Sequence, residues 1–164
     1  MDNEVKKFSD QDFEKLKIIA EERYSQFGEV NSPYLQRKII FNSKGREHLK
    51  FKAKHRARSR QDQWIRFKLL KFAPEVIKLS RTLQGISKAK SFELNRSNQR
   101  NEMILMDVVY YEFIVVIDER IMVRVIIKQI GAAQPFFWSI IPFWKKNNKN
   151  EMEKCINYGN PEED

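Results

Sequence analysis

The sequence is poor in the residues that build several common kinds of functional site. Its single cysteine, Cys155, excludes an internal disulfide and any zinc site made of several cysteines. None of its five glycines belongs to a GxxxxGK pattern, which excludes the phosphate-binding loop of P-loop nucleotide hydrolases. There is no HExxH motif, and the carboxylates of the second half are scattered, which argues against a two-metal nuclease centre. We therefore expect neither a metal nor a cofactor.

Long apolar runs are also missing. The longest apolar stretch, residues 108–117, is interrupted by Glu112 and is too short to span a bilayer. The first ten residues, MDNEVKKFSD, lack the apolar segment of a secretory signal. A hydrophobic content of 41% across 164 residues is still sufficient for the packed core of one domain. The sequence predicts a soluble, cytoplasmic protein with no membrane partner, and it leaves the oligomeric state open.

The sequence has an excess of positive charge, and much of it lies in one segment. Residues 44–60 hold eight of the 31 basic residues and one acidic residue, Glu47, within a chain of net charge +9. Like charges this close repel one another, and the phosphates of RNA or DNA are the usual polyanion that neutralises them. The segment contains both histidines, His48 and His55, and histidine ordinarily titrates near neutral pH. A solvated helix face with two incidental histidines is the alternative interpretation.

Hydrophobic spacing divides the chain into a helical first half and a strand-rich second half. Helices are predicted over residues 10–27, 43–54, 59–72 and 74–83, strands over 91–95, 104–117, 121–130 and 136–142, and a short strand or helix lead-in over 38–42. The predicted fold class is α+β, with N-terminal helices packed on a four-stranded antiparallel β-sheet. The predicted organisation is an N-terminal helix and connector (1–37), one compact domain (38–144) and a flexible polar tail (145–164).

The predicted strand 121–130 carries two cations on one face. Alternation directs Arg124 and Lys128 away from the core, about 13 Å apart. If the following GAAQ segment is a four-residue hairpin loop, Ile126 faces Ser139, which then lies diagonally between the two cations. A hydroxyl between two cations is suited to hold one phosphate. The alternative is an ordinary solvent face, and a shift of one residue in the register would turn Ser139 to the other side.

The predicted helix after Ser43 offers a base. Lys44, His48 and Lys52 lie at i, i+4 and i+8, so they share one helix face. Neighbouring cations disfavour the protonated imidazole and keep His48 available as a base near pH 7. A surface histidine without a role is the alternative. The candidates for contacts with the RNA backbone are Lys44, Lys50, Lys52, Lys54, His55, Arg56, Arg58 and Arg60.

Three segments resemble a known group of nucleases. The segments FNSKGREHL, DQWIRFKLLKFAPEVI and VRVIIKQIG…FFWSIIP look like the phage-linked nuclease families of the barnase/EndoU/colicin/RelE (BECR) superfamily, over residues 39–142. The resemblance implies N-terminal helices on a four-stranded antiparallel sheet and a metal-independent RNase, frequently a toxin. It places the helix histidine of the family on His48, the strand cations on Arg124 and Lys128, and the hydroxyl of the last strand on Ser139.

Our first hypothesis is a toxin-like, metal-independent endoribonuclease. RNA supplies the nucleophile in its 2′-OH, and cleavage leaves a 2′,3′-cyclic phosphate. His48 would move the proton, Arg124 and Lys128 would stabilise the phosphoryl charge, and Ser139 would orient the phosphate. The alternatives are a non-catalytic RNA- or DNA-binding module, and a basic domain that docks an acidic partner such as an antitoxin or immunity protein.

Overall fold

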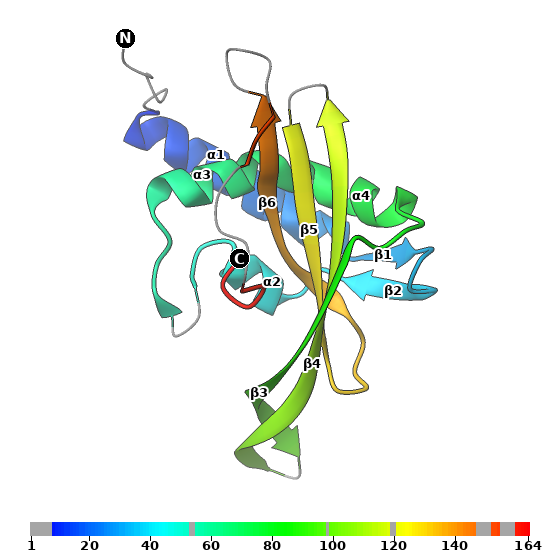
Figure 1. Cartoon of the computed structure of the whole chain (residues 1–164). Coiled ribbons are helices and arrows are strands. Elements are labelled where there is room, and N and C mark those ends of the chain that lie inside the picture. Colours follow the sequence, from blue (N-terminus) through cyan, green and yellow to red (C-terminus); the bar gives the residue numbers. More distant parts are fainter. Residues whose placement is uncertain (1–7, 53–54, 98, 119–120, 147–151, 155–159) are drawn as a thin grey trace.

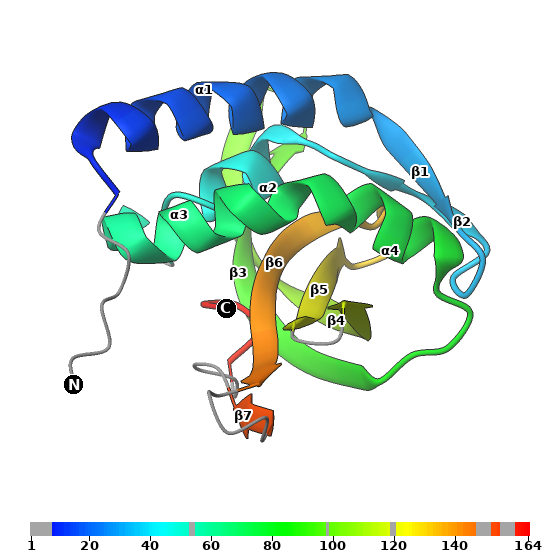
Figure 2. The same cartoon turned by 90° about the horizontal axis from the view of Figure 1, so that it is seen from above.

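The computed structural model describes residues 8–52, 55–97, 99–118, 121–146, 152–154 and 160–164. It shows an α+β fold in which helices cover one face of a β-sheet (Figures 1 and 2). Within the described residues, no helix is long and apolar enough to cross a membrane. The elements are α1 (Asp10–Phe27), β1 (Glu29–Ser32), β2 (Arg37–Ile40), α2 (Ser43–His48), α3 (Arg60–Leu69), the 3₁₀-helix η2 (Leu70–Phe72), α4 (Ala73–Leu79), β3 (Gly85–Ser97), β4 (Arg100–Asp118), β5 (Ile121–Ile130), β6 (Phe136–Lys146) and β7 (Met152–Lys154).

The long helices begin where local capping signals place them. At the start of α1, the Ser9 hydroxyl accepts a bond from the Asp12 N–H, and the Asp12 carboxylate accepts one from the Ser9 N–H. Gly28 ends this helix with a φ of 59°, a left-handed value that favours glycine. At the start of α3, the Ser59 hydroxyl accepts from the Asp62 N–H, and Pro74 lies in the first turn of α4. The starts of these helices were therefore predictable from short patterns.

The predicted helix from Ser43 to about Lys54 is wrong in its second half. α2 ends at His48, and the chain then folds back on itself instead of continuing as a helix. The Lys52 N–H donates to the Arg56 carbonyl, and the Arg58 N–H donates to the Lys50 carbonyl, at 2.7 and 2.8 Å. Lys52 therefore does not share a helix face with His48. The reversal returns Arg58 to the end of α2, where it contacts His48.

The sheet is larger than predicted and is not purely antiparallel. Its order is β1-β2-β6-β5-β4-β3, with β7 also paired to β6. Strands β3 to β6 form the predicted antiparallel meander, but the β1–β2 hairpin joins it in parallel through Ile40 and Phe136. The prediction of four antiparallel strands is corrected to this mixed sheet, within the α+β class. The short strand considered over residues 38–42 corresponds to β2, whereas β1 and β7 were missed because three or four residues are too few to show a clear alternation.

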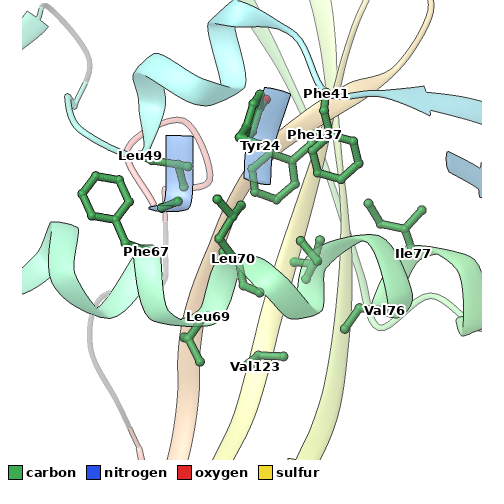
Figure 3. Packing of buried hydrophobic residues seen from close by; sticks show 14 of the residues in the cluster. Tyr24, Phe41, Leu49, Phe67, Leu69, Leu70, Val76, Ile77, Val123 and Phe137 are labelled. Atoms are coloured by element: carbon green, nitrogen blue, oxygen red, sulfur yellow. The ribbon is translucent and has the colours of Figure 1, made fainter. Parts of the chain in front are cut away.

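The main core lies between the helices and the sheet (Figure 3). Val123, Val125 and Ile127 of β5 are fully buried there, as the alternation predicts. A second, smaller cluster covers the opposite face of the sheet. It consists of Val108, Tyr110, Ile126, Ile130, Phe136 and Trp138. The candidate site lies on this second face, beside the cluster.

Strands β3 and β4 continue beyond the helices as a long hairpin (Figure 1). On the far part of this hairpin Phe92 is paired with Leu105, and Leu94 is paired with Met103. All four side chains are exposed. The hairpin also carries Glu93, which reaches into the candidate site.

Candidate functional site

A β-bulge in β6 brings two neighbouring side chains to the same face. Ile126 pairs with Ser139 and Ile127 pairs with Phe137, so Trp138 is the extra residue between the two pairs. Trp138 belongs to the second cluster, and Ser139 contacts the same side of the sheet. Ile126 pairs with Ser139 as predicted, but the register expected from a four-residue loop is wrong: Lys128 pairs with Phe136, and the bulge then shifts the register by one residue. Simple alternation would have separated Trp138 from Ser139, so the bulge is what places an aromatic ring beside the buried hydroxyl.

Helix α2 packs closely against β6 because it contains Gly45. A Cβ atom at this position would overlap the Phe137 carbonyl oxygen and the Tyr24 hydroxyl. The Asn42 side chain caps the helix by accepting from the Gly45 N–H at 3.1 Å. The close contact places His48 over Trp138, with ring centroids 3.8 Å apart and nearly parallel planes. Gly45 lowers helix propensity, but it sets the distance between the histidine and the sheet.

Arg58 fixes the orientation of His48. The residue is 3% exposed. Its Nε donates to the His48 carbonyl at 2.8 Å, and its Nη2 lies 2.9 Å from the His48 Nε2. An arginine can only donate, so Nε2 accepts and the imidazole is neutral with its proton on Nδ1. Burial lowers the pKa of His48 far below its ordinary value, and the charges of Arg58, Arg66 and Lys128 lower it further.

Asp62 couples Arg58 to a second buried arginine. The Asp62 carboxylate on α3 accepts from Arg58 Nη1 at 3.2 Å and from Arg66 Nε at 2.7 Å. Arg66 then donates through Nη1 to the Ser139 hydroxyl and to the backbone oxygen of Asp164. Asp62 and Arg66 lie one turn apart on α3, and Arg58 precedes the helix by two residues, so the four-residue spacing places all three on the same side. Helix α3 therefore supplies a cation directed at Ser139.

The two cations of β5 are buried in ion pairs instead of lying on a solvent face. The Nη2 of Arg124 binds the Glu112 carboxylate. Its Nη1 donates to Asp164 Oδ2 at 2.7 Å. The Lys128 ammonium lies 3.2 Å from Glu93 and 4.3 Å from the centre of the Trp138 ring. Burial lowers the pKa of Lys128, while the charge of Glu93 acts in the opposite direction.

The acidic end of the chain fills the space among these cations. We call residues 160–164 the acidic segment; it lies beside α2 in Figure 1 and near β3 and β6 in Figure 2. The Ser139 hydroxyl donates to the Asp164 backbone oxygen at 2.8 Å, and Arg58 Nη2 donates to the Glu163 carbonyl at 2.8 Å. Burial raises the pKa of Glu162 to about 7, with further contributions from the charges of Glu93 and Glu163.

Two more contacts attach the acidic segment to β5 and β6. The Lys128 ammonium binds the Glu162 carboxylate at 2.9 Å, and the Trp138 indole N–H donates to the Pro161 carbonyl at 3.0 Å. Within the described part of the chain, every buried side-chain nitrogen or oxygen has a hydrogen-bond partner. The site is thus closed and satisfied while the acidic segment is in place.

The acidic segment separates two clefts. One, of about 440 Å³, lies along Arg58, Arg66 and Ile141, and Asp164 forms part of its wall. The other, of about 460 Å³, lies along His48 and Trp138 and includes Glu162. Because residues of the acidic segment line both clefts, its removal would open a longer groove across the second face of the sheet.

The structure brings together the four predicted catalytic candidates. His48, Arg124, Lys128 and Ser139 all surround the acidic segment, although their catalytic roles stay predictions. Sequence reasoning missed Arg66, and it placed Arg58 among the surface contacts. The spacing of Arg58, Asp62 and Arg66 at four-residue intervals could have predicted their contact, since charged residues four positions apart are neighbours on one helix face.

The other residues of the predicted RNA-binding set are dispersed. Lys50 pairs with Glu21 and Glu47, Arg56 pairs with Glu163, and Arg60 pairs with Asp10. Lys54 lies outside the described residues. Lys44, Lys52 and His55 line the cleft beside His48 and have no ion pair within the described part of the chain. The basic run is therefore partly neutralised by the protein itself.

Among the described residues, no group of three or more His, Cys, Asp or Glu side chains is placed to hold a metal ion. Comparison of the chain with protein-family models, with curated proteins and with solved structures gives no match.

Proposed function

We propose that the protein is a metal-independent endoribonuclease whose reacting phosphate takes the position of Asp164. The observation that supports this is the convergence of donors from three elements on one acidic residue. Arg66 on α3, Arg124 on β5 and Ser139 on β6 all donate to Asp164. Donors that are fixed in a buried site stabilise charge developing on a phosphoryl oxygen, because they need no reorganisation during the reaction.

The neutral His48 is assigned to proton transfer. The 2′-oxygen of RNA attacks phosphorus, the bond from phosphorus to the 5′-oxygen breaks, and the products are a 2′,3′-cyclic phosphate and a 5′-hydroxyl. His48 takes the proton of the 2′-OH, and water gives a proton to the leaving 5′-oxygen, which lies on the opposite side of phosphorus. The imidazolium then returns its proton to solvent, so protons balance. Its Nε2 now accepts from Arg58. The Arg58 N–H must therefore turn to the phosphate before Nε2 can accept the substrate proton.

The charge of the site favours a reaction without a metal ion. Arg58, Arg66, Arg124 and Lys128 are all buried, and they repel a divalent cation. The carboxylates that approach them are already engaged: Asp62 by two arginines, Glu112 by Arg124 and Glu93 by Lys128. The assignment as a toxin or as phage-associated stays a prediction from the resemblance.

The test is cleavage of a synthetic RNA in the presence of EDTA, with a DNA of the same sequence as the control. We expect fragments that end in a 2′,3′-cyclic phosphate and begin with a 5′-hydroxyl, and no cleavage of the DNA. Cleavage that requires added magnesium would contradict the proposal. Binding without any cleavage would also contradict it and would favour the non-catalytic binding module.

A further inference from the structure

We propose that the acidic segment, residues 160–164, is an internal inhibitor that occupies the anion site in place of a phosphate ligand. The inference builds on the proposed function, which names the ligand that competes with the segment. It concerns what holds the site closed, and it can be tested without RNA.

The contacts of the acidic segment match the demands of a phosphate ligand. Asp164 offers carboxylate and backbone oxygens to Arg124, Arg66 and Ser139, and these are the donors assigned to the phosphate. Ion pairs between guanidinium and carboxylate use the same geometry as those between guanidinium and phosphate. Asp164 is itself buried, so a phosphate cannot reach these donors while it is in place.

The acidic segment also occupies a second anion position. Glu162 binds Lys128 at 2.9 Å, on the same strand face as Arg124. Arg124 and Lys128 are separated by about 13 Å of strand, and the segment supplies one carboxylate to each. A chain that places successive anions over successive cations has the general layout of a nucleic acid backbone. The segment therefore covers the groove, not only the central donor cluster.

Hydrogen bonds to backbone oxygens hold the acidic segment in one register. The Trp138 indole donates to the Pro161 carbonyl at 3.0 Å, and Arg58 donates to the Glu163 carbonyl at 2.8 Å. These bonds use backbone oxygens, which neither free phosphate nor RNA would supply in the same way. They indicate a fitted intramolecular contact in addition to charge attraction.

A competitor tethered to the site reduces the affinity for an external anion. The apparent affinity equals the intrinsic affinity multiplied by the fraction of molecules in which the site is open. If the segment is docked about nine-tenths of the time, an external anion binds about tenfold more weakly than its intrinsic affinity. Weakening the segment should restore that affinity. The expected change is therefore an increase in binding when carboxylates of the segment are neutralised.

The first experiment measures binding of inorganic pyrophosphate by calorimetry in the full chain. The test variant is Glu162→Gln/Asp164→Asn, and the matched control is Glu14→Gln/Glu22→Gln, which removes two negative charges from exposed positions of α1. We expect about tenfold tighter binding in the test variant and unchanged binding in the control. Equal affinity in the test variant and the parent would overturn the inference.

The second experiment needs no variant. The parent protein is digested with a glutamate-specific protease at increasing pyrophosphate concentration, and cutting after Glu162 and Glu163 is followed by mass spectrometry. If pyrophosphate displaces the acidic segment, cutting there accelerates and saturates with pyrophosphate binding. Cutting that does not respond would overturn the inference. Neither experiment involves RNA, so a failure to cleave RNA would contradict the proposed function alone.

Discussion

At the scale of residues, burial divides the basic residues of the site into two groups with different tasks. Arg58 and Arg66 are enclosed and act on His48 and Ser139, whereas Lys44 and Lys52 line an open cleft. The sequence shows the charges and their spacing, so it could indicate a polyanion site. It could not show which charges are buried, because burial depends on β6, which is distant in sequence.

The pH dependence of stability should depend on His48. Burial and the charges of Arg58, Arg66 and Lys128 lower its pKa below the ordinary value of about 6.5. The unfolded chain takes up this proton and the folded protein does not. The stabilisation is therefore complete above about pH 6.5 and is lost as the pH falls, by up to about 1.4 kcal/mol per pH unit.

The measurement is denaturant unfolding between pH 7.5 and 5.0. The variant His48→Gln should show a flatter decline than the parent. The exposed histidine, His55, provides the matched control, and His55→Gln should follow the parent. An equally steep decline in His48→Gln would show that His48 is not the group responsible.

The Arg124–Glu112 pair allows structural and functional roles to be separated. Both side chains are enclosed, so Arg124→Met should cost about 3 kcal/mol by leaving the Glu112 carboxylate without its cation. Adding Glu112→Gln should restore part of this stability, since Asp164 still lacks the Arg124 cation, but not the binding of pyrophosphate. Stability comes from chemical denaturation and binding from calorimetry. Recovery of both properties in the double variant would show that Arg124 has no role in anion binding.

At the scale of elements, the sequence predicted the pieces with strong local signals. The caps at Ser9 and Ser59 and the bounds of β5 agree with the structure. Besides the short strands β1 and β7, the end of α2 at His48 and the bulge at Trp138 were missed. Both depend on contacts between distant segments. The return of the chain to His48 requires a buried partner for Arg58, and no local pattern reports such a partner.

Gly45 should be intolerant of any side chain. The variant Gly45→Ala introduces a methyl group against the Phe137 carbonyl and the Tyr24 hydroxyl, and overpacking of this kind costs about 1 to 3 kcal/mol. It does so although alanine has the higher helix propensity. The measurement is the denaturation midpoint, with Ser43→Ala at an exposed position of the same helix as the control. A Gly45→Ala variant more stable than the parent would contradict the close packing of α2 on β6.

At the scale of the whole molecule, the α+β class and the meander follow from the sequence, and the complete site does not. His48, Arg124, Lys128 and Ser139 were found because strand alternation and charge spacing are local properties. Arg66 lies on a helix inside the predicted compact domain, and the acidic segment lies outside that domain. The segment falls in the predicted polar tail, where composition alone gives no reason to expect burial of Asp164.

The salt dependence of RNA binding should report which charges face a ligand. Replacing Lys44 or Lys52 by glutamine should lower the slope of log affinity against log salt by roughly 0.7 for each phosphate that the variant no longer neutralises. Lys50→Gln is the matched control, because Lys50 already pairs with Glu21 and Glu47. Equal effects at Lys50 and Lys52 would show that binding follows total charge and not the cleft beside His48.

The central claim is that a phosphodiester takes the place of Asp164, and a crystal structure with a non-cleavable RNA tests it most directly. A short RNA with a 2′-O-methyl group at the scissile position retains the phosphate and lacks the nucleophile. We predict a phosphate within hydrogen-bonding distance of the Ser139 hydroxyl and of the guanidinium groups of Arg66 and Arg124, with the acidic segment displaced. An RNA bound only along residues 44–60, with Asp164 still in contact with Arg124, would contradict the account.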